Sequence, residues 1–322
     1  MKKILRLTIT KYHFAIQEEL NDEVALKALK GDEEIKSTKL YSIVQTNRMY
    51  VNHDSFSIDK DYNISLNIHI NNKLKVVKFN LMEYYFELYK SFFKSLDTFI
   101  NFLEEQVMKL EYFEQNPISK NEIYKFINII EDYSYSSVIC IKCPFDYILS
   151  SCKYDSVFMN IYRILNHFNI KNIKDDLEII YIGKSLDDTL QRLKTHEKWS
   201  EVHTKDRKNP NNDYDYLVYM FNFKQDDIDF TNMLNPIKDS KYNIEDIVDN
   251  LETTLISHFK PMLNKKKIDV DFPNSKFVKK ELKDNGYDGL IIYKDMKDNT
   301  LMADIKTSHM QEEKVDMFLS IQ

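Results

Sequence analysis

Apolar and polar residues alternate along residues 64–70 and 73–79, within a stretch, 39–79, whose pattern favours strands. A period of two is typical of strands with one buried face. Asn71-Asn72 between the two segments suits a tight turn, so we predict a β-hairpin. From residue 81 to 113 apolar residues recur at helical spacing, which predicts one long helix or two stacked helices that end at Asn116-Pro117.

The second half of the chain mixes short apolar runs with amphipathic segments. A short helix is expected at 121–130, followed by strands at 136–141, 177–182 and 216–223. Helices are expected at 156–168, at 185–197 with Ser185 as the N-cap, and at 244–259, with a loop at 200–215. This order predicts an α+β fold.

Three regions follow from these patterns. Residues 1–116 form an N-terminal region of strands closed by a long helix, with a possible role in recognition or partner binding. Residues 117–270 form the α+β domain. Residues 271–322 form an extension with one helix and two strands, at 290–293 and 301–305, for which the sequence suggests no chemistry.

Composition places the chain among folded proteins. Of its 322 residues, 43% are hydrophobic and 13% aromatic, whereas glycine and proline are scarce. The formal net charge of -6 gives no global reason to expect a polyanion, so nucleic-acid binding requires a local basic surface. No signal peptide or membrane span is expected, and three cysteines suit a reducing compartment. We therefore expect a cytoplasmic or otherwise intracellular protein with no membrane partner.

Candidate chemistry begins where the predicted strand at 177–182 ends. Tyr181 is followed by Gly183, which permits a tight turn and a close approach to a ligand, and by Lys184. On the next predicted helix Arg192 and His196 are four residues apart and so share a face. A tyrosine, a lysine, an arginine and a histidine are thus expected to converge.

Glu252 supplies the carboxylate of this candidate site. On the predicted helix 244–259 it projects away from the apolar stripe, and it is the natural ligand for Mg²⁺ or Mn²⁺. Hydrolysis of a phosphodiester needs an activated water, neutralised phosphate charge and help for the leaving oxygen. A metal held by the carboxylate with Arg and Lys nearby supplies the last two, and a tyrosine or histidine supplies the first.

The ordered set resembles the GIY-YIG nuclease superfamily. Its elements are Tyr181-Ile182-Gly183, then Arg192 and His196, then LETTLI at 251–256 and Lys260-Pro261-Met262-Leu263-Asn264. The resemblance covers about residues 136–267. It implies a small three-stranded antiparallel sheet flanked by helices, and an endonuclease that cleaves DNA with one divalent metal.

The same resemblance implies roles for individual residues. It makes Tyr181 the tyrosine of the YIG motif, Arg192 a phosphate ligand and Glu252 the metal ligand. Lys184 matches a lysine present in some members, His196 the position one turn after the arginine, and Asn264 a structural asparagine.

In this chain, the strand expected to carry the family's first motif lacks the tyrosine of that motif. The best match, 136–141, has Ile139 or Cys140 where the family has tyrosine, and Tyr133 or Tyr135 is the alternative. An insertion at about 144–176 separates this strand from Tyr181. The missing tyrosine motivates a second hypothesis, a binding module on the same fold that no longer turns over.

Other polar residues have weaker signals. His203, Lys205, Arg207 and Lys208, together with Lys265, Lys266 and Lys267, are candidate phosphate contacts. Cys140, Cys143 and Cys152 favour free thiols over a zinc site because no second ligand pair completes the set. A third hypothesis is an interaction protein that acts through its aromatic-rich N-terminal region. DNA or RNA as substrate, and the oligomeric state, stay open.

Overall fold

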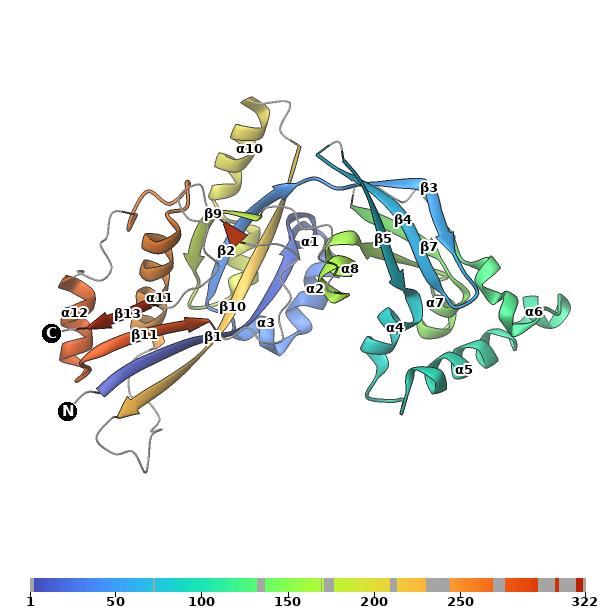
Figure 1. Cartoon of the computed structure of the whole chain (residues 1–322), viewed down its shortest axis with the longest axis horizontal. Helices are drawn as coiled ribbons and strands as arrows, with labels where there is room; N and C mark the ends of the chain where they lie inside the picture. The colour runs from blue at the N-terminus through green and yellow to red at the C-terminus, as the bar shows by residue number, and fades with distance from the viewer. Residues whose placement is uncertain are drawn as a thin grey trace. The chain divides into compact units, whose positions relative to one another are not determined.

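The structure is a computed structural model that describes residues 3–71, 73–131, 137–168, 170, 177–208, 213–229, 244–268, 276–294, 305–306 and 317–320. The chain divides into two compact units (Figure 1). Unit 1 comprises Met1–Thr46 and Asp175–Gln322, and unit 2 comprises Asn47–Lys174. Unit 2 is thus inserted into the sequence of unit 1. This division differs from the boundaries predicted at 116 and 270.

The described strands of unit 1 form one seven-stranded sheet of order β12-β9-β2-β10-β1-β11-β13. β1 pairs with β10 in antiparallel register over most of its length, and β1–β11 and β12–β9 are parallel pairs. The strands are β1 (Lys3–Ile16), β2 (Leu40–Asn47), β9 (Leu177–Lys184), β10 (Tyr214–Asp229), β11 (Gly289–Lys294), β12 (Ile305–Lys306) and β13 (Met317–Ser320).

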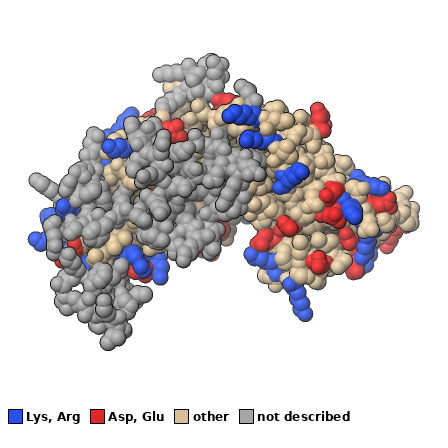
Figure 2. All heavy atoms as spheres, in the orientation of Figure 1, with Lys and Arg blue, Asp and Glu red and all other residues tan. Residues whose placement is uncertain are grey.

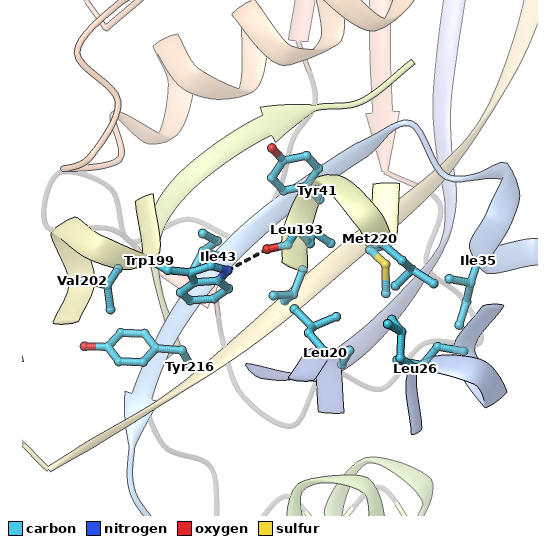
Figure 3. Close-up of a cluster of buried hydrophobic side chains, with 14 of the residues drawn as sticks. Leu20, Leu26, Ile35, Tyr41, Ile43, Leu193, Trp199, Val202, Tyr216 and Met220 are labelled. Carbon is cyan, nitrogen blue, oxygen red and sulfur yellow. Dashed lines mark hydrogen bonds between the residues drawn. The ribbon is translucent and has the colours of Figure 1, made fainter. Parts of the chain in front are cut away.

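Short helices cover one face of this sheet. Alternate residues of β2 and β10, among them Ile43 and Val218, pack with Leu20 of α1, Leu190 of α9 and Trp199 of α10 in one apolar cluster (Figure 3). The helices of unit 1 are α1 (Gln17–Asn21), α2 (Glu23–Gly31), α3 (Glu33–Ser37), α9 (Thr189–Lys194), α10 (Lys198–Lys208), α11 (Ile244–Phe259) and α12 (Lys276–Asp284). Burial of this cluster stabilises the layer.

Unit 2 contains two three-stranded sheets, of order β3-β4-β5 and β6-β7-β8. Its strands are β3 (Tyr50–Ile58), β4 (Asn63–Ile70), β5 (Lys73–Asn80), β6 (Asn128–Ile129), β7 (Val138–Lys142) and β8 (Ser156–Asn160). Its helices are α4 (Leu81–Tyr89), α5 (Leu96–Val107), α6 (Glu111–Gln115), the 3-10 helix η1 (Lys120–Phe126), α7 (Pro144–Leu149) and α8 (Ile161–His167).

Local periodicity predicted several elements correctly. The structure confirms the α+β class, the β4–β5 hairpin, β9 and β10, and α11 has the predicted bounds. The helical stretch 81–113 is divided into α4, α5 and α6, because Ser95 caps a new helix by accepting a hydrogen bond from the backbone N–H of Thr98.

Other predicted elements were wrong. Residues 156–160 form β8 rather than the start of a helix, and α9 begins after the cap Asp188, not Ser185, and ends at Lys194. The predicted loop 200–215 contains most of α10, which is anchored by two buried residues, Trp199 and Val202. So few apolar positions in a polar segment give little helical signal.

No helix among the described residues is both long and apolar enough to cross a membrane.

A buried acidic group lies in the core of unit 2. Asp146 is 7% exposed, and one of its oxygens accepts a hydrogen bond from the Tyr85 hydroxyl at 2.8 Å, whereas the other has no partner in the described structure. Burial raises the pKa of Asp146 to about 7, and the Tyr85 hydrogen bond opposes this rise. Folding therefore takes up a proton at this carboxyl between about pH 4 and pH 7.

We expect the stability of unit 2 to fall as the pH rises through this range. The contribution of Asp146 is complete below its unfolded pKa of about 4 and is lost as the pH approaches its folded pKa of about 7. Asp146→Asn should remove that slope, on the order of a few kcal/mol, in urea unfolding of the full chain between pH 5 and 8. Asp54→Asn, at an exposed carboxyl of the same unit, is the control and should leave the slope unchanged.

Candidate active site

The candidate site lies where β2 and β9 pair in antiparallel register. Tyr41 is opposite Gly183 and Ile43 is opposite Tyr181, with a register shift directly after Ile43. The side chains of Tyr41 and Tyr181 therefore approach each other, and their ring centroids are 6.3 Å apart. The two tyrosines are about 140 residues apart in the sequence.

Gly183 permits this approach of the two rings. A Cβ atom at this position would lie 2.7 Å from a ring carbon of Tyr181 and 2.8 Å from the Cζ and hydroxyl of Tyr41. Both distances are shorter than packed carbon atoms tolerate. The glycine is required by the space that the tyrosine rings occupy.

Tyr41 is 1% exposed, and its hydroxyl points away from the apolar cluster below it (Figure 3). Burial raises the pKa of Tyr41 above its ordinary value, and the nearby Tyr181 adds to this rise. The guanidinium of Arg192 opposes it by its charge and by a hydrogen bond. Tyr41 thus stays protonated at neutral pH, with a cation in contact.

Tyr181 has similar electrostatic surroundings but is only partly buried. Burial raises its pKa, and the negative charge of Glu252 raises it further. Arg192 and a hydrogen bond with Tyr41 act in the opposite direction. The two hydroxyls, the guanidinium and the carboxylate therefore belong to one electrostatic group.

His196 packs against both tyrosines and does not act as an ordinary titrating histidine. Its ring centroid is 5.7 Å from that of Tyr41 and 4.8 Å from that of Tyr181, and the residue is 3% exposed. Burial, reinforced by the charge of Arg192, lowers its pKa to about 4. Its Nδ1 accepts the Lys198 backbone N–H at 3.1 Å, so the imidazole is neutral at physiological pH with its proton on Nε2.

The structure also corrects the expected location of His196. α9 ends at Lys194, so the histidine follows the helix instead of lying one helical turn after Arg192. A neutral imidazole with this pKa is a poor base for activating water.

Asn264 braces β9 from the segment that follows α11. Its amide Nδ2 donates to the Ile182 carbonyl and its Oδ1 accepts from the Ile182 N–H, both at 2.9 Å. The Leu263 N–H donates to the Ile180 carbonyl at 2.9 Å. The side-chain amide thus satisfies backbone groups directly beside Tyr181 and Gly183, and it holds β9 close to the register shift in its pairing with β2.

Glu252 projects from α11 and meets a lysine. The residue is 9% exposed, and its carboxylate accepts a hydrogen bond from Lys267 Nζ at 2.7 Å. The same ammonium is 3.2 Å from Asp249, one turn earlier on α11, and Lys184 Nζ is 2.8 Å from that aspartate. Lys267 has a backbone φ of 68°, in the left-handed region that non-glycine residues rarely adopt. The ammonium of Lys267 thus lies against one oxygen of the Glu252 carboxylate.

A hydrated divalent cation suits this donor set. Within the described residues no three His, Cys, Asp or Glu side chains cluster as a closed metal cage would require. A single hard carboxylate is the kind of donor used by Mg²⁺ or Mn²⁺, which retain several water ligands, and in this structure Lys267 is paired with it.

Most predicted site residues converge. Tyr181 forms the tyrosine pair with Tyr41, and Arg192 and Glu252 are close enough to act on its pKa. His196 packs against the Tyr181 ring, Asn264 lies beside β9, and Lys184 pairs with Asp249. The predicted first-motif strand does not take part, because β7, which carries Ile139 and Cys140, pairs with β6 and β8 in unit 2. Tyr133 and Tyr135 lie outside the described residues.

The predicted phosphate contacts are distributed differently. Lys267 is paired with Glu252, Lys265 Nζ is 3.7 Å from Glu201, and Lys266 is exposed. His203 Nε2 is 3.0 Å from Gln17 Nε2 on exposed surface. Lys205, Arg207 and Lys208 belong to α10, but their side chains lie outside the described part of the chain. Of the cysteines, Cys140 and Cys143 are buried free thiols and Cys152 is an exposed one.

Sequence reasoning missed Tyr41 and Asp249. Tyr41 lies in the stretch predicted as strands, but nothing local distinguishes it among the 21 tyrosines of the chain. Asp249 precedes Glu252 by three residues on the predicted helix, a spacing that places both on one face.

Comparison of this chain with models of known protein families, with curated proteins and with solved structures found no match.

Gly183→Ala should destabilise the chain and disrupt the site, because the added methyl group meets two tyrosine rings that the surrounding core holds. We expect a loss of about 1–3 kcal/mol in the free energy of unfolding, measured by urea denaturation. Gly31→Ala is the matched control, since nothing lies within 4 Å of its Cβ position. Equal stability of the two variants would show that the rings move aside freely.

Proposed function

We propose that unit 1 is a divalent-metal-dependent endonuclease that hydrolyses phosphodiester bonds in DNA. The observation that carries this proposal is the pair of tyrosine rings that meet over Gly183, with the guanidinium of Arg192 and the carboxylate of Glu252 close enough to act on the pKa of both hydroxyls. This combination offers groups that orient a water molecule, bind a phosphate oxygen and hold a metal.

Tyr41 supports the resemblance to the GIY-YIG superfamily. That resemblance requires a second tyrosine on the strand beside the YIG strand, and Tyr41 occupies such a position on β2. The order β9-β2-β10 within the sheet also agrees with the three neighbouring strands that the resemblance implies. In this proposal unit 2 is an insertion between the two tyrosine motifs.

The residues of the site have distinct proposed tasks. Arg192 is exposed in the last turn of α9. It binds a phosphate oxygen of the substrate, because a guanidinium forms strong charge-assisted hydrogen bonds with phosphate. The hydroxyls of Tyr41 and Tyr181 orient the attacking water. Tyr41 is protonated although Arg192 lies against its hydroxyl and lowers its pKa. Loss of the Tyr41 proton therefore requires a further positive charge nearby.

Glu252 would hold the Mg²⁺ or Mn²⁺ ion, which when bound neutralises phosphate charge and promotes deprotonation of the nucleophile. Asn264 keeps β9 in register, and His196 supports the faces of both tyrosine rings. These two residues position the reactive groups, and neither is expected to transfer a proton.

A second candidate function is a nucleic-acid-binding module without turnover. The ion pair between Lys267 and Glu252 favours it, because a lysine that permanently satisfied this carboxylate would leave no ligand for a metal. The two functions differ in whether this ammonium can be displaced.

Glu252→Gln should abolish Mg²⁺- or Mn²⁺-dependent cleavage of DNA, because it removes the charge that holds the cation. Tyr41→Phe retains the ring and removes only the hydroxyl, so we expect cleavage about 10²- to 10⁴-fold slower. Both variants are assayed on plasmid and oligonucleotide DNA, with unfolding curves as the control for folding. Undiminished cleavage by Glu252→Gln would reject the assignment.

Lys267→Gln should tighten Mn²⁺ binding, because the lysine ammonium competes with the metal for Glu252. We expect an increase of about five- to tenfold in isothermal titration calorimetry without DNA. Lys266→Gln, at the exposed neighbouring lysine, should bind Mn²⁺ as the wild type does. Weaker binding by Lys267→Gln would mean that the lysine orients Glu252 for the metal.

A further inference from the structure

Isolated ion pairs are common on the described surface of this protein. Figure 2 shows basic and acidic side chains close together over unit 2. Pairs such as Lys90–Glu87 and Lys125–Glu122 join one exposed lysine to one exposed glutamate. Exposed pairs of this kind contribute little to stability, because water and salt screen them.

The ion pairs at α11 differ because four side chains share them in series. Lys184 Nζ is 2.8 Å from Asp249 Oδ1, and Lys267 Nζ is 3.2 Å from the same oxygen. Lys267 Nζ is also 2.7 Å from Glu252 Oε2. The exposed fractions of these side chains range from 12% for Glu252 to 44% for Asp249, so solvent screens the series only in part. We call these four residues the α11 ion-pair network.

The backbone fixes where the members of this network lie. Asp249 and Glu252 are three residues apart on α11 and so share a face of that helix, which packs against β9. Lys184 is the last residue of β9. Lys267 follows Asn264, whose side-chain amide is hydrogen-bonded to the backbone of β9. Asp249 therefore keeps its contact with Lys184 whether or not Lys267 also reaches it.

Lys267 has two acceptors within hydrogen-bond distance, and Glu252 is the closer one. One ammonium group has three donors, so it can contact both carboxylates at once. Lys267 must leave Glu252 when that carboxylate binds a divalent cation, because two cations repel each other at contact distance. A half-buried ammonium without an acceptor would be costly. Asp249 removes this cost, since a small rotation of the flexible lysine side chain is enough to pair the two fully.

Asp249 is less suited than Glu252 to bind a metal itself. Its Oδ1 atom already accepts contacts from the ammonium groups of Lys184 and Lys267. A divalent cation at this oxygen would meet two positive charges instead of one. The geometry thus gives the two carboxylates of α11 different tasks.

We propose that Asp249 receives Lys267 when a divalent metal occupies Glu252. Lys267 bridges both carboxylates in the structure described above, and it pairs with Asp249 alone once Glu252 is engaged. Asp249 is then a positioning residue, which eases displacement of the lysine without contacting the metal. This inference rests on the proposed function, because it takes Glu252 as the metal ligand.

The test is a double-mutant cycle on Mn²⁺ affinity, measured by isothermal titration calorimetry with the full-length protein and no DNA. Asp249→Asn should weaken Mn²⁺ binding about fivefold when Lys267 is present, because the displaced ammonium loses its acceptor. In the Lys267→Gln background the same substitution should change the affinity by less than about twofold. Asp249→Glu should restore the affinity of the wild type, since it retains a carboxylate within reach of Lys267.

Glu197→Gln is the matched control for the loss of a nearby negative charge. Glu197 is exposed, and its charge acts on the pKa of Tyr181. This variant should change the Mn²⁺ affinity by less than about twofold in both backgrounds. Equal weakening by Asp249→Asn in both backgrounds would make Asp249 a metal ligand and overturn the proposal. Equal effects of Asp249→Asn and Glu197→Gln, or no rescue by Asp249→Glu, would also overturn it.

The role of Asp249 and the nuclease function fail separately in these measurements. The expected cycle without any DNA cleavage by the wild type would retain the role of Asp249 and reject the nuclease function. Mn²⁺-dependent cleavage with additive effects of the Asp249 and Lys267 substitutions on Mn²⁺ affinity would do the reverse. Mn²⁺ binding unchanged by Glu252→Gln would overturn the role of Asp249, because the metal would then lie elsewhere.

Discussion

Tyr41 lies opposite Gly183 because β2 and β9 are antiparallel neighbours, and the site depends on this register. A slip of one residue would turn Tyr41 and Ile43 to the other face of the sheet, away from Arg192 and out of the apolar cluster. The same register places the tyrosine rings over Gly183, which lacks a Cβ atom. Core packing and site geometry are therefore set by the same strand pairing.

Burial and charge act together on the groups that this register assembles. Desolvation keeps both tyrosines protonated and His196 neutral, so Arg192, Lys184 and Lys267 supply the positive charge of the site and Glu252 and Asp249 the negative charge. Such a set of opposed, partly buried charges is sensitive to any cation that enters it. The ammonium of Lys267 already occupies Glu252, so a metal that bound this carboxylate would have to displace the lysine.

Much of the fold was predictable where the signal is local. The β4–β5 hairpin and α11 follow from alternation and helical periodicity over a few residues, and Tyr181, Arg192, Glu252 and Asn264 follow from their order along one continuous segment. The partner of β9 was not predictable in this way. β2 precedes it by more than a hundred residues, and β7, the nearer apolar strand, belongs to a different sheet. Strand pairing is a long-range property that hydrophobic periodicity does not encode.

The insertion of unit 2 also affects how the site forms during folding. Gln45 and Glu178 are paired in the sheet, so the chain that leaves β2 returns to the neighbouring strand only after the whole of unit 2. Closing such a long connection as a random coil costs entropy and slows assembly. If unit 2 folds first, it reduces this connection to a compact body, in the way that domains fold as units. Tyr41 and Tyr181 then meet late, so partly folded chains would not yet contain the assembled site.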